Sequence, residues 1–495
     1  MKKSSRNVKL FHTPEKKAKQ IRAAKKIVTR PHKEGEPKVR TRVPSTRDYH
    51  AGELSPGTSA RNNKGPKDGD DPVVFVTYTP QERPKDLSIV NHYPPDPCGD
   101  DSEPGVILQT GNDYIRYSTD HGNKFQMLAN TAIIDNKFAG GEHGDQRVIF
   151  VPTIGCFIWY IQYNPVPSNG DGAFRLAFAK LSDLQTKIKN VWSSYDWVAS
   201  DFGLTGTDFD YPDIAATEQF LYVTTGTNSQ GRLLMRMKLS DFVAGSVTAQ
   251  HLPLLSITTK KDKSEDSLRY AHLCEQARDR AILAGHVDNS TLRIFDWPDN
   301  GNLATHDVTT VTWPNTRDYS SKCPDQTDWL SNGGDTSISG LVRQSGNLWL
   351  AWCASRGSAG GGAFKYPNPH CRVATIRMSD WTETAEMQVW NPDYAFAFPD
   401  LSVNSRGEIA IGVGWGGPSN YADAEFGIIG DFVVWYQDGS DAAKPRWGDF
   451  VTVNRSKWRD NSFAGFGYFS KKDSKVGGGV YQEPYYVRFA RKSQP

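Results

Sequence analysis

The sequence has no long apolar run, which argues against a helical membrane protein. Nowhere in its 495 residues do about 18 apolar residues follow one another, the length that a helix needs to cross a bilayer. The first ten residues carry charge but no apolar segment, so we predict no standard secretory signal. We therefore expect no transmembrane segment and a soluble protein, either cytoplasmic or exported by a non-classical route, with the compartment left open.

The motifs of common metal and nucleotide sites are also missing. The six cysteines include no Cys-x-x-Cys pair, and no His-Glu-x-x-His sequence occurs, so a zinc site is not indicated. No Gly-Lys-Ser/Thr follows the glycine-rich loops, which argues against a phosphate loop. We expect no cofactor and free, buried thiols, with a Cys353–Cys371 disulfide left open for an oxidising compartment.

Helical periodicity is scarce, whereas aromatic residues and glycines are abundant. Aromatic residues reach 12% of the chain, with 14 Trp, and glycine occurs 44 times. β-Strands favour aromatic and β-branched side chains, and glycine suits the tight turns between strands. The composition therefore predicts an all-β protein.

A short pattern recurs six times, at intervals of roughly 50 to 70 residues, which is typical of the blades of a β-propeller. Each copy opens a run of alternating apolar residues, and a turn and a second β-rich run follow it. The copies begin at Asp145, Tyr211-Pro-Asp213, Tyr270-Ala-His272, Asp335, Phe398-Pro-Asp400 and Trp447-Gly-Asp449. We predict a β-propeller over residues 105–495.

The number of blades depends on how the ring closes. Closure commonly places strands from both chain ends in one blade, which removes an exposed strand edge. The hairpin expected over residues 105–128 is the candidate donor, which predicts six blades. If that hairpin forms a blade of its own, the count becomes seven. Residues 71–104 are expected to be a connector or docking arm.

The N-terminal region differs from the rest in charge and pattern. Residues 1–42 hold 15 Lys or Arg and 3 Glu, a balance of +12, so the total of +2 leaves −10 for the remaining chain. Residues 1–70 have no sustained apolar pattern, which predicts a disordered basic tail. Residues 14–29 are the one stretch with a helical pattern. The tail could bind a polyanion or a partner protein through residues 1–42.

One turn resembles the Asp-box of the sialidase-like propellers. The sequence Ser118-Thr-Asp120-His-Gly122-Asn-Lys-Phe125 matches the box except that Lys124 replaces a threonine. We expect Ser118 and Asp120 to bond backbone amides, Gly122 to take a positive φ, and Phe125 to fill the blade. The six strand openings, above all Arg446-Trp-Gly-Asp-Phe450, are similar to those of the same group. The resemblance implies a propeller, with the box as a structural element, and it carries over no activity.

The repeated openings predict a ring of side chains at one mouth of the channel. If each opening starts an innermost strand, its carboxylate either accepts hydrogen bonds from turn amides or the neighbouring blade or faces a ligand. That ligand could be a cation such as Ca²⁺, sugar hydroxyls or a basic peptide. Arginines and aromatic residues beside the carboxylates would suit sugar hydroxyls and sugar faces. The ligand-binding candidates are Asp145, Arg147, Tyr211, Asp213, Arg269, Tyr270, His272, Asp335, Asp400, Arg446, Trp447 and Asp449.

These observations favour a ligand-binding propeller, with a carbohydrate or glycoconjugate as the ligand and no recognisable catalytic set. A sialidase would need three converging arginines, a Tyr–Glu pair and an acidic residue, and the Arg-Ile-Pro motif of that family is absent. The alternative is an interaction scaffold, or a cargo recruited through its basic tail. A glycoside hydrolase using two mouth carboxylates is the third hypothesis. Catalytic residues cannot be assigned from the sequence.

Overall fold

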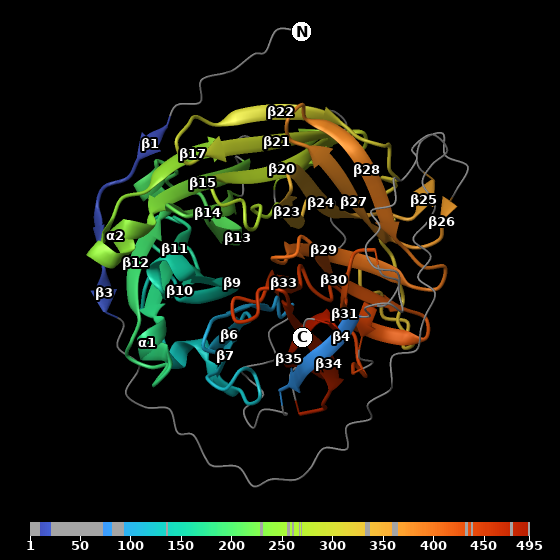
Figure 1. Cartoon of the computed structure of the whole chain (residues 1–495), viewed down its shortest axis with the longest axis horizontal. Coiled ribbons are helices and arrows are strands. Elements are labelled where there is room, and N and C mark those ends of the chain that lie inside the picture. Colours follow the sequence, from blue (N-terminus) through green and yellow to red (C-terminus); the bar gives the residue numbers. More distant parts are fainter. Residues whose placement is uncertain are drawn as a thin grey trace.

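The structure is a computed structural model, in which strands follow one another around a central axis (Figure 1). It describes residues 10–20, 73–81, 94–134, 137–227, 231–254, 258–259, 262–266, 268, 270–331, 337–358, 365–430, 434–436, 439–475 and 479–493. Among these residues, no helix is long and apolar enough to cross a membrane.

Seven antiparallel sheets form the blades, in sequence order around the ring. Blade 1 has β5 (Cys98–Asp101), β6 (Ile107–Thr110), β7 (Tyr114–Ser118) and β8 (Gln126–Ala129). Blade 2 has β9 (Glu142–Val151), β10 (Cys156–Tyr163), β11 (Ala173–Lys180) and β12 (Ser193–Val198). Blade 3 has β13 (Phe209–Ala216), β14 (Phe220–Thr227), β15 (Gly231–Lys238) and β17 (Gln250–Leu254).

The remaining blades follow the same plan. Blade 4 has β20 (Arg280–Asp288), β21 (Thr291–Pro298) and β22 (Ala304–Thr309). Blade 5 has β23 (Gly340–Gln344), β24 (Asn347–Ala354), β27 (His370–Arg377) and β28 (Thr382–Val389). Blade 6 has β29 (Ala395–Val403), β30 (Ile409–Gly417), β31 (Asn420–Ile428) and β32 (Val434–Tyr436). Blade 7 has β33 (Thr452–Arg455), β34 (Phe463–Lys472), β35 (Val480–Arg491) and β4 (Val73–Pro80).

Short elements decorate the blades. The helices α1 (Leu181–Leu184) and α2 (Leu239–Ala244) follow β11 and β15, and the short strands are β16 (Ser246–Val247), β18 (Thr258–Thr259), β19 (Asp262–Asp266), β25 (Gly357–Ser358) and β26 (Lys365–Tyr366). In blade 4 the innermost position is taken by the irregular segment 270–275, where the Cys274 amide donates to the Ile282 carbonyl of β20 at 2.7 Å.

The blade count corrects the sixfold prediction in favour of the seven-bladed alternative. The hairpin expected over residues 105–128 forms its own blade, because β5 completes it on the channel side. The strand that closes the ring is instead β4, within the segment expected to be a docking arm, and it pairs with β35 in blade 7. Closure by β4 covers the outer edge of β35, the strand that comes last in the chain.

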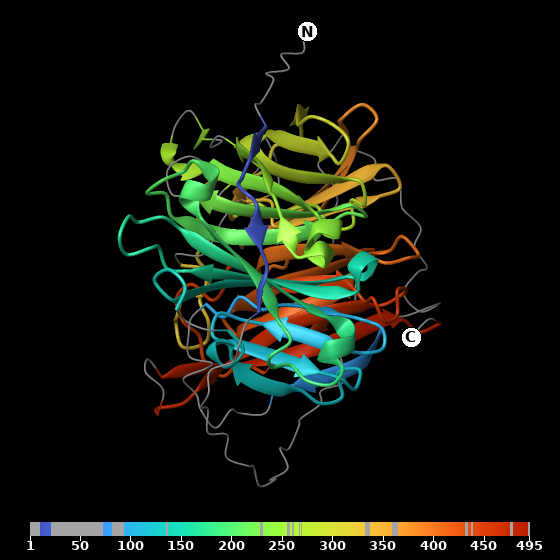
Figure 2. The ribbon, with the colours of Figure 1, turned by 90° about the vertical axis from the view of Figure 1, so that its left-hand side faces the viewer.

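A strap of residues 10–20 crosses the outer edges of blades 2 and 3 (Figure 2). Its strands are β1 (Phe11–His12), β2 (Lys16–Lys17) and β3 (Lys19–Gln20), which pair with β17, β16 and β12. This region was expected to be disordered or to begin a helix over residues 14–29. The backbone edges of two blades provide the hydrogen bonds that extended residues need, and the Lys16 amine donates to Asp201 at 2.7 Å. Residues 21–29 lie outside the described part.

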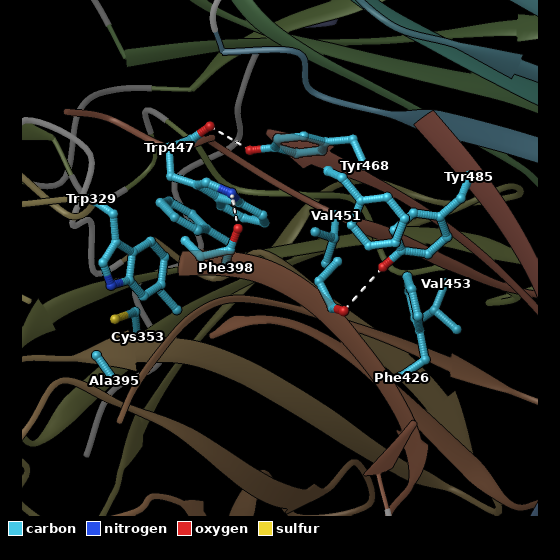
Figure 3. Packing of buried hydrophobic residues seen from close by; sticks show 14 of the residues in the cluster. Trp329, Cys353, Ala395, Phe398, Phe426, Trp447, Val451, Val453, Tyr468 and Tyr485 are labelled. Atoms are coloured by element: carbon cyan, nitrogen blue, oxygen red, sulfur yellow. Dashed lines mark hydrogen bonds between the residues drawn. The ribbon is translucent and has the colours of Figure 1, made fainter. Parts of the chain in front are cut away.

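Large apolar side chains fill the spaces between blades. Figure 3 shows the cluster between blades 6 and 7, where Trp447 lies among Trp329, Phe398 and Tyr468. Trp447 is fully buried, and its indole N–H donates to the Ala422 carbonyl at 3.1 Å. This residue was expected at the channel mouth, and the structure places it in the core instead.

All six cysteines are free and buried, as the sequence led us to expect. Cys353 and Cys371 face each other across β24 and β27 without a disulfide.

The Asp-box turn between β7 and β8 confirms the expected geometry. The Ser118 hydroxyl accepts the Gly122 amide at 3.0 Å, and Asp120 accepts the Lys124 amide at 3.0 Å. Gly122 has φ +82°, which favours glycine. Phe125 packs against the cluster at the seam of blades 1 and 7.

The two N-terminal segments are predicted to stabilise the ring unequally. A variant that starts at residue 91 lacks β4 and leaves the edge of β35 open, so we expect a loss of about 3 kcal/mol or more and aggregation. A variant that starts at residue 70 keeps β4 and loses only the strap, for which we expect about 1 kcal/mol. Urea unfolding of both would measure this, and equal losses would contradict the role given to β4.

Candidate functional site at the channel

Three innermost strands begin with a β-bulge that sets where each side chain points. The bulge of β9 lies at Asp145, that of β13 at Tyr211 and that of β29 at Phe398. Each of these residues has a positive φ, of 39°, 51° and 54°, which is uncommon outside glycine. Asp145 is therefore the structural equivalent of Tyr211 and Phe398.

This equivalence corrects the single ring of side chains predicted from the sequence. Two residues after the bulge, Arg147 occupies the position that Asp213 and Asp400 take in their own blades. The candidates therefore form two layers. A mouth layer contains Asp145, Tyr211, Tyr270, Arg446 and Asp449, and a deeper channel layer contains Arg147, Asp213, His272 and Asp400. Arg269 and Asp335 lie outside the described residues.

Carboxylates of the innermost strands bind backbone amides of the next blade. Asp213 accepts the Leu273 amide at 2.7 Å, and Asp400 accepts the Val453 amide at 2.8 Å. Asp145 accepts the Tyr211 amide at 3.2 Å. The sequence left open whether these carboxylates bind neighbouring amides or face a ligand, and these three bind amides. Such pairing offsets the cost of burying a carboxylate.

The six strand openings found in the sequence do not include the corresponding opening of blade 1. There Asp100 accepts the Phe150 amide of blade 2 at 2.8 Å, and Asp96, with φ 45°, accepts the Asp449 amide of blade 7 at 2.9 Å. The sequence Tyr93-Pro-Pro-Asp96 was the available signal, and it differs from the aromatic-Pro-Asp form by one additional proline.

Arg147 is the cation at the centre of the channel layer. Its Nε lies 3.4 Å from Asp213, and its Nη2 donates to His272 Nε2 at 2.8 Å. Its guanidinium also lies over the Phe450 ring at 3.7 Å. Burial, and next the charge of Arg147, hold the pKa of His272 well below its usual value, so His272 is neutral and accepts this hydrogen bond.

The channel layer encloses a small polar cavity of about 20 Å³, room for about one ordered water. Burial raises the pKa of Asp400 to about 7. The pKa of Glu275, which lines the same cavity, is raised well above its usual value by burial and then by Asp400. Both carboxyls are therefore harder to ionise than exposed acids. A sugar ring is too large for this cavity.

The mouth layer is bridged from one side to the other. Arg446 of blade 7 donates from Nη2 to the Tyr211 hydroxyl of blade 3 and from Nε to Asp449 at 3.1 Å. The ring of Tyr211 meets that of Tyr270 edge-on, with centroids 3.7 Å apart. The Arg446 side chain is 40% exposed, whereas that of Asp449 is 8% exposed, so Arg446 is the charge that the mouth presents to solvent.

Carboxylates crowd the mouth around this one arginine. Burial raises the pKa of Asp145 well above its usual value, and the neighbouring Asp210 raises it further. Burial and next Asp449 raise the pKa of Asp96 to about 7. Among the described residues, no group of three or more His, Cys, Asp or Glu could hold a metal ion. Within the described residues, the mouth is therefore a narrow, acid-rich surface on which Arg446 lies beside Tyr211 and Tyr270.

The chain matches no protein-family model and no curated protein sequence. Among solved structures it is similar to the α-L-arabinofuranosidase Arb93A of Fusarium graminearum, with TM-score 0.39 and 9% identity over 84% of this chain and 97% of that one. It is also similar to an α-L-arabinanase of Penicillium chrysogenum, with TM-score 0.37 and 12% identity over 72% and 98% of the two chains. A third is the sialidase of Trypanosoma rangeli, with TM-score 0.33 and 10% identity over 79% and 53%. Similarity at this level decides nothing about activity, and the propeller assignment rests on the strand pairing of the chain itself.

Arg147 is predicted to be essential for stability. In Arg147→Met, Asp213 loses its cation while it stays buried, so we expect a loss of about 3–5 kcal/mol at neutral pH. The loss should shrink as the pH falls, because protonation removes the uncompensated charge. Chemical denaturation at pH 5 and pH 8 measures both effects. Arg377→Met, which removes an exposed arginine of blade 5, is the control with little expected loss.

The raised pKa of Asp400 predicts a pH-dependent stability. Between the ordinary value of 3.8 and about 7, the folded protein keeps a proton that the unfolded chain has released, so the unfolding free energy falls as the pH rises through this window. In Asp400→Asn, which can still accept the Val453 amide, this slope should flatten by up to about 1.4 kcal/mol per pH unit. An unchanged slope would show that Asp400 does not titrate there.

Proposed function

We propose that the protein is a carbohydrate-binding propeller whose mouth layer binds an uncharged sugar without hydrolysing it. The observation that carries this proposal is the exposed Arg446 guanidinium held beside Tyr211 and Tyr270. An arginine fixed by Asp449 can donate to sugar hydroxyls, and the partly exposed Tyr270 ring offers apolar contact to sugar C–H groups. Tyr211 is only 6% exposed and holds Arg446 in place. The ligand would lie on the mouth rather than inside the channel, because the cavity below is small.

The charge of the mouth favours neutral over acidic sugars. Asp96, Asp145, Asp210 and Asp449 surround Arg446, and Asp449 already takes two of its N–H groups. A sugar carboxylate would meet this acidic surface, and the arginine that the described residues place there, Arg446, is already paired with Asp449. Recognition of sialic acid by three converging arginines therefore has no counterpart among the described residues, where Arg147 is buried in the channel.

The buried acids support binding rather than hydrolysis. A glycosidase needs two carboxyls that reach the two sides of a glycosidic bond. Asp145, Asp213 and Asp400 each accept a backbone amide from a neighbouring blade or strand and are nearly inaccessible to solvent. Carboxyls engaged in this way serve the assembly of the ring.

A glycan array probed with the full chain, together with a panel of fluorogenic glycosides, tests this proposal. We expect neutral glycans to be bound and no glycoside to be cleaved. In Arg446→Ala, binding should weaken by roughly 10- to 100-fold, the value of one or two hydrogen bonds to a charged group. Arg377→Ala removes an equally exposed arginine from blade 5 and should bind as the unaltered protein does.

Thermal unfolding of each variant separates lost contacts from lost folding. Failure of the unaltered protein to bind any glycan would contradict the proposal. Hydrolysis of a glycoside that is lost in Asp145→Asn would favour the glycoside hydrolase instead.

A further inference from the structure

A cluster of cationic groups surrounds Trp458 at the opposite end of the strands from the mouth. Trp458 lies in the loop between β33 and β34, at the seam of blades 7 and 1. The ring of His121, from the Asp-box turn of blade 1, lies 4.2 Å from it. The guanidinium groups of Arg488 and Arg459 lie over the same indole at 4.6 and 5.2 Å. Two blades thus bring one histidine and two arginines to one side chain.

Arg488 is buried and makes no direct ion pair with a carboxylate of the described residues, although the charge of Asp101 acts on it from nearby. The residue is 5% exposed, and its Nε and Nη1 have no hydrogen-bond partner. A buried guanidinium with two nitrogen atoms that lack a hydrogen-bond acceptor is costly, and the indole face compensates only part of this cost. In agreement, burial lowers the pKa of Arg488.

The acid whose charge acts on Arg488, Asp101, and its neighbour Asp100 are already bound to other groups. The Asp101 carboxylate accepts the Ser456 hydroxyl and the Lys457 amide at 2.5 Å each. Asp100 pairs with the Lys457 amine at 3.1 Å. Neither carboxylate forms a direct ion pair with Arg488, so neither satisfies its N–H groups.

Two more polar groups of the same seam have no partner. The Tyr486 hydroxyl is buried and unbonded, and it lies two residues before Arg488 on the same face of β35. His121 Nδ1 is likewise buried and unbonded. The Tyr486 ring lies 5.8 Å from Phe125 of the Asp-box turn, so both groups belong to the contact between β35 and that turn.

We propose that this seam binds a single oxyanion, a phosphate or a sulfate group, with Arg488 as its main ligand and Arg459 as the outer one. An oxyanion has the oxygen acceptors that the planar Arg488 fork lacks, and arginine pairs with such groups through parallel hydrogen bonds. His121 and Tyr486 supply further polar groups at the same contact. This site is separate from the mouth and does not depend on the proposed sugar binding.

Thermal unfolding of the full chain in rising inorganic phosphate, with sodium chloride lowered to hold the ionic strength constant, tests the site. We expect a saturable increase in the unfolding temperature, as for a ligand that binds only the folded state. Sulfate should act in the same way. Phosphoserine, offered in a separate arm, shows whether the site takes only a free anion or also a phosphate group attached to a larger molecule.

Variants identify the residues responsible. In Arg488→Met the response to phosphate should disappear, while the unfolding temperature without phosphate should not fall, because an unpaired buried charge is removed. Arg459→Ala, at an exposed position, should weaken phosphate binding about tenfold and keeps the test usable if Arg488→Met does not fold. Arg488→Lys, which keeps the charge without the planar fork, should respond at reduced affinity.

Arg377→Ala, far from the seam in blade 5, should respond to phosphate as the unaltered protein does. The absence of a phosphate response in the unaltered protein would overturn the proposal. So would an equal response in Arg488→Met, because it would show a general salt effect.

Discussion

Hydrogen bonds between neighbouring innermost strands are the interaction on which the ring depends. An antiparallel sheet satisfies its own backbone, but a propeller must also join sheets that share no edge. Here Asp100, Asp213 and Asp400 each accept an amide from the next blade. Arg147 also binds the next blade, but as the donor: its Nε donates to the Pro212 carbonyl at 3.2 Å. These short polar contacts hold the strand openings in register around the channel.

The same contacts limit what the channel can do. A buried carboxylate that accepts a neighbouring amide cannot also contact a substrate. Burial raises the pKa of each of these groups, and that of Asp400 to about 7. Chemistry or binding is therefore left to side chains beyond the bulges, at the mouth. Arg446 and Tyr211, which bond across the ring, narrow the mouth, and Arg446 is the group that the proposed sugar binding uses there.

The N-terminal region completes the ring at two places. β4 covers the edge of the last blade, and the strap of residues 10–20 covers edges of blades 2 and 3. Part of the basic charge of the N-terminal region stabilises the fold, because Lys16 pairs with Asp201 of the acidic propeller. Basic residues of this region therefore form contacts within the molecule itself.

Local features of the sequence determined the all-β fold, the repeated strand openings, the free thiols and the Asp-box turn. Each depends on residues close together in the chain, such as Ser118 and Asp120. Only the tertiary structure decided that there are seven blades, because closure depends on the pairing of β4 with β35, some 400 positions apart along the chain. Strands pair through backbone groups, which are the same in every residue type except proline, so the sequence does not show which strands pair. It also decided that Asp145 corresponds to Tyr211 rather than to Asp213. The β-bulge and the positive φ that align these two residues cannot be recognised from the residue types alone. Trp447 lies in the core and Arg446 at the mouth, although they are neighbours in the irregular segment before β33. Only the packing between blades determines which of the two side chains is buried.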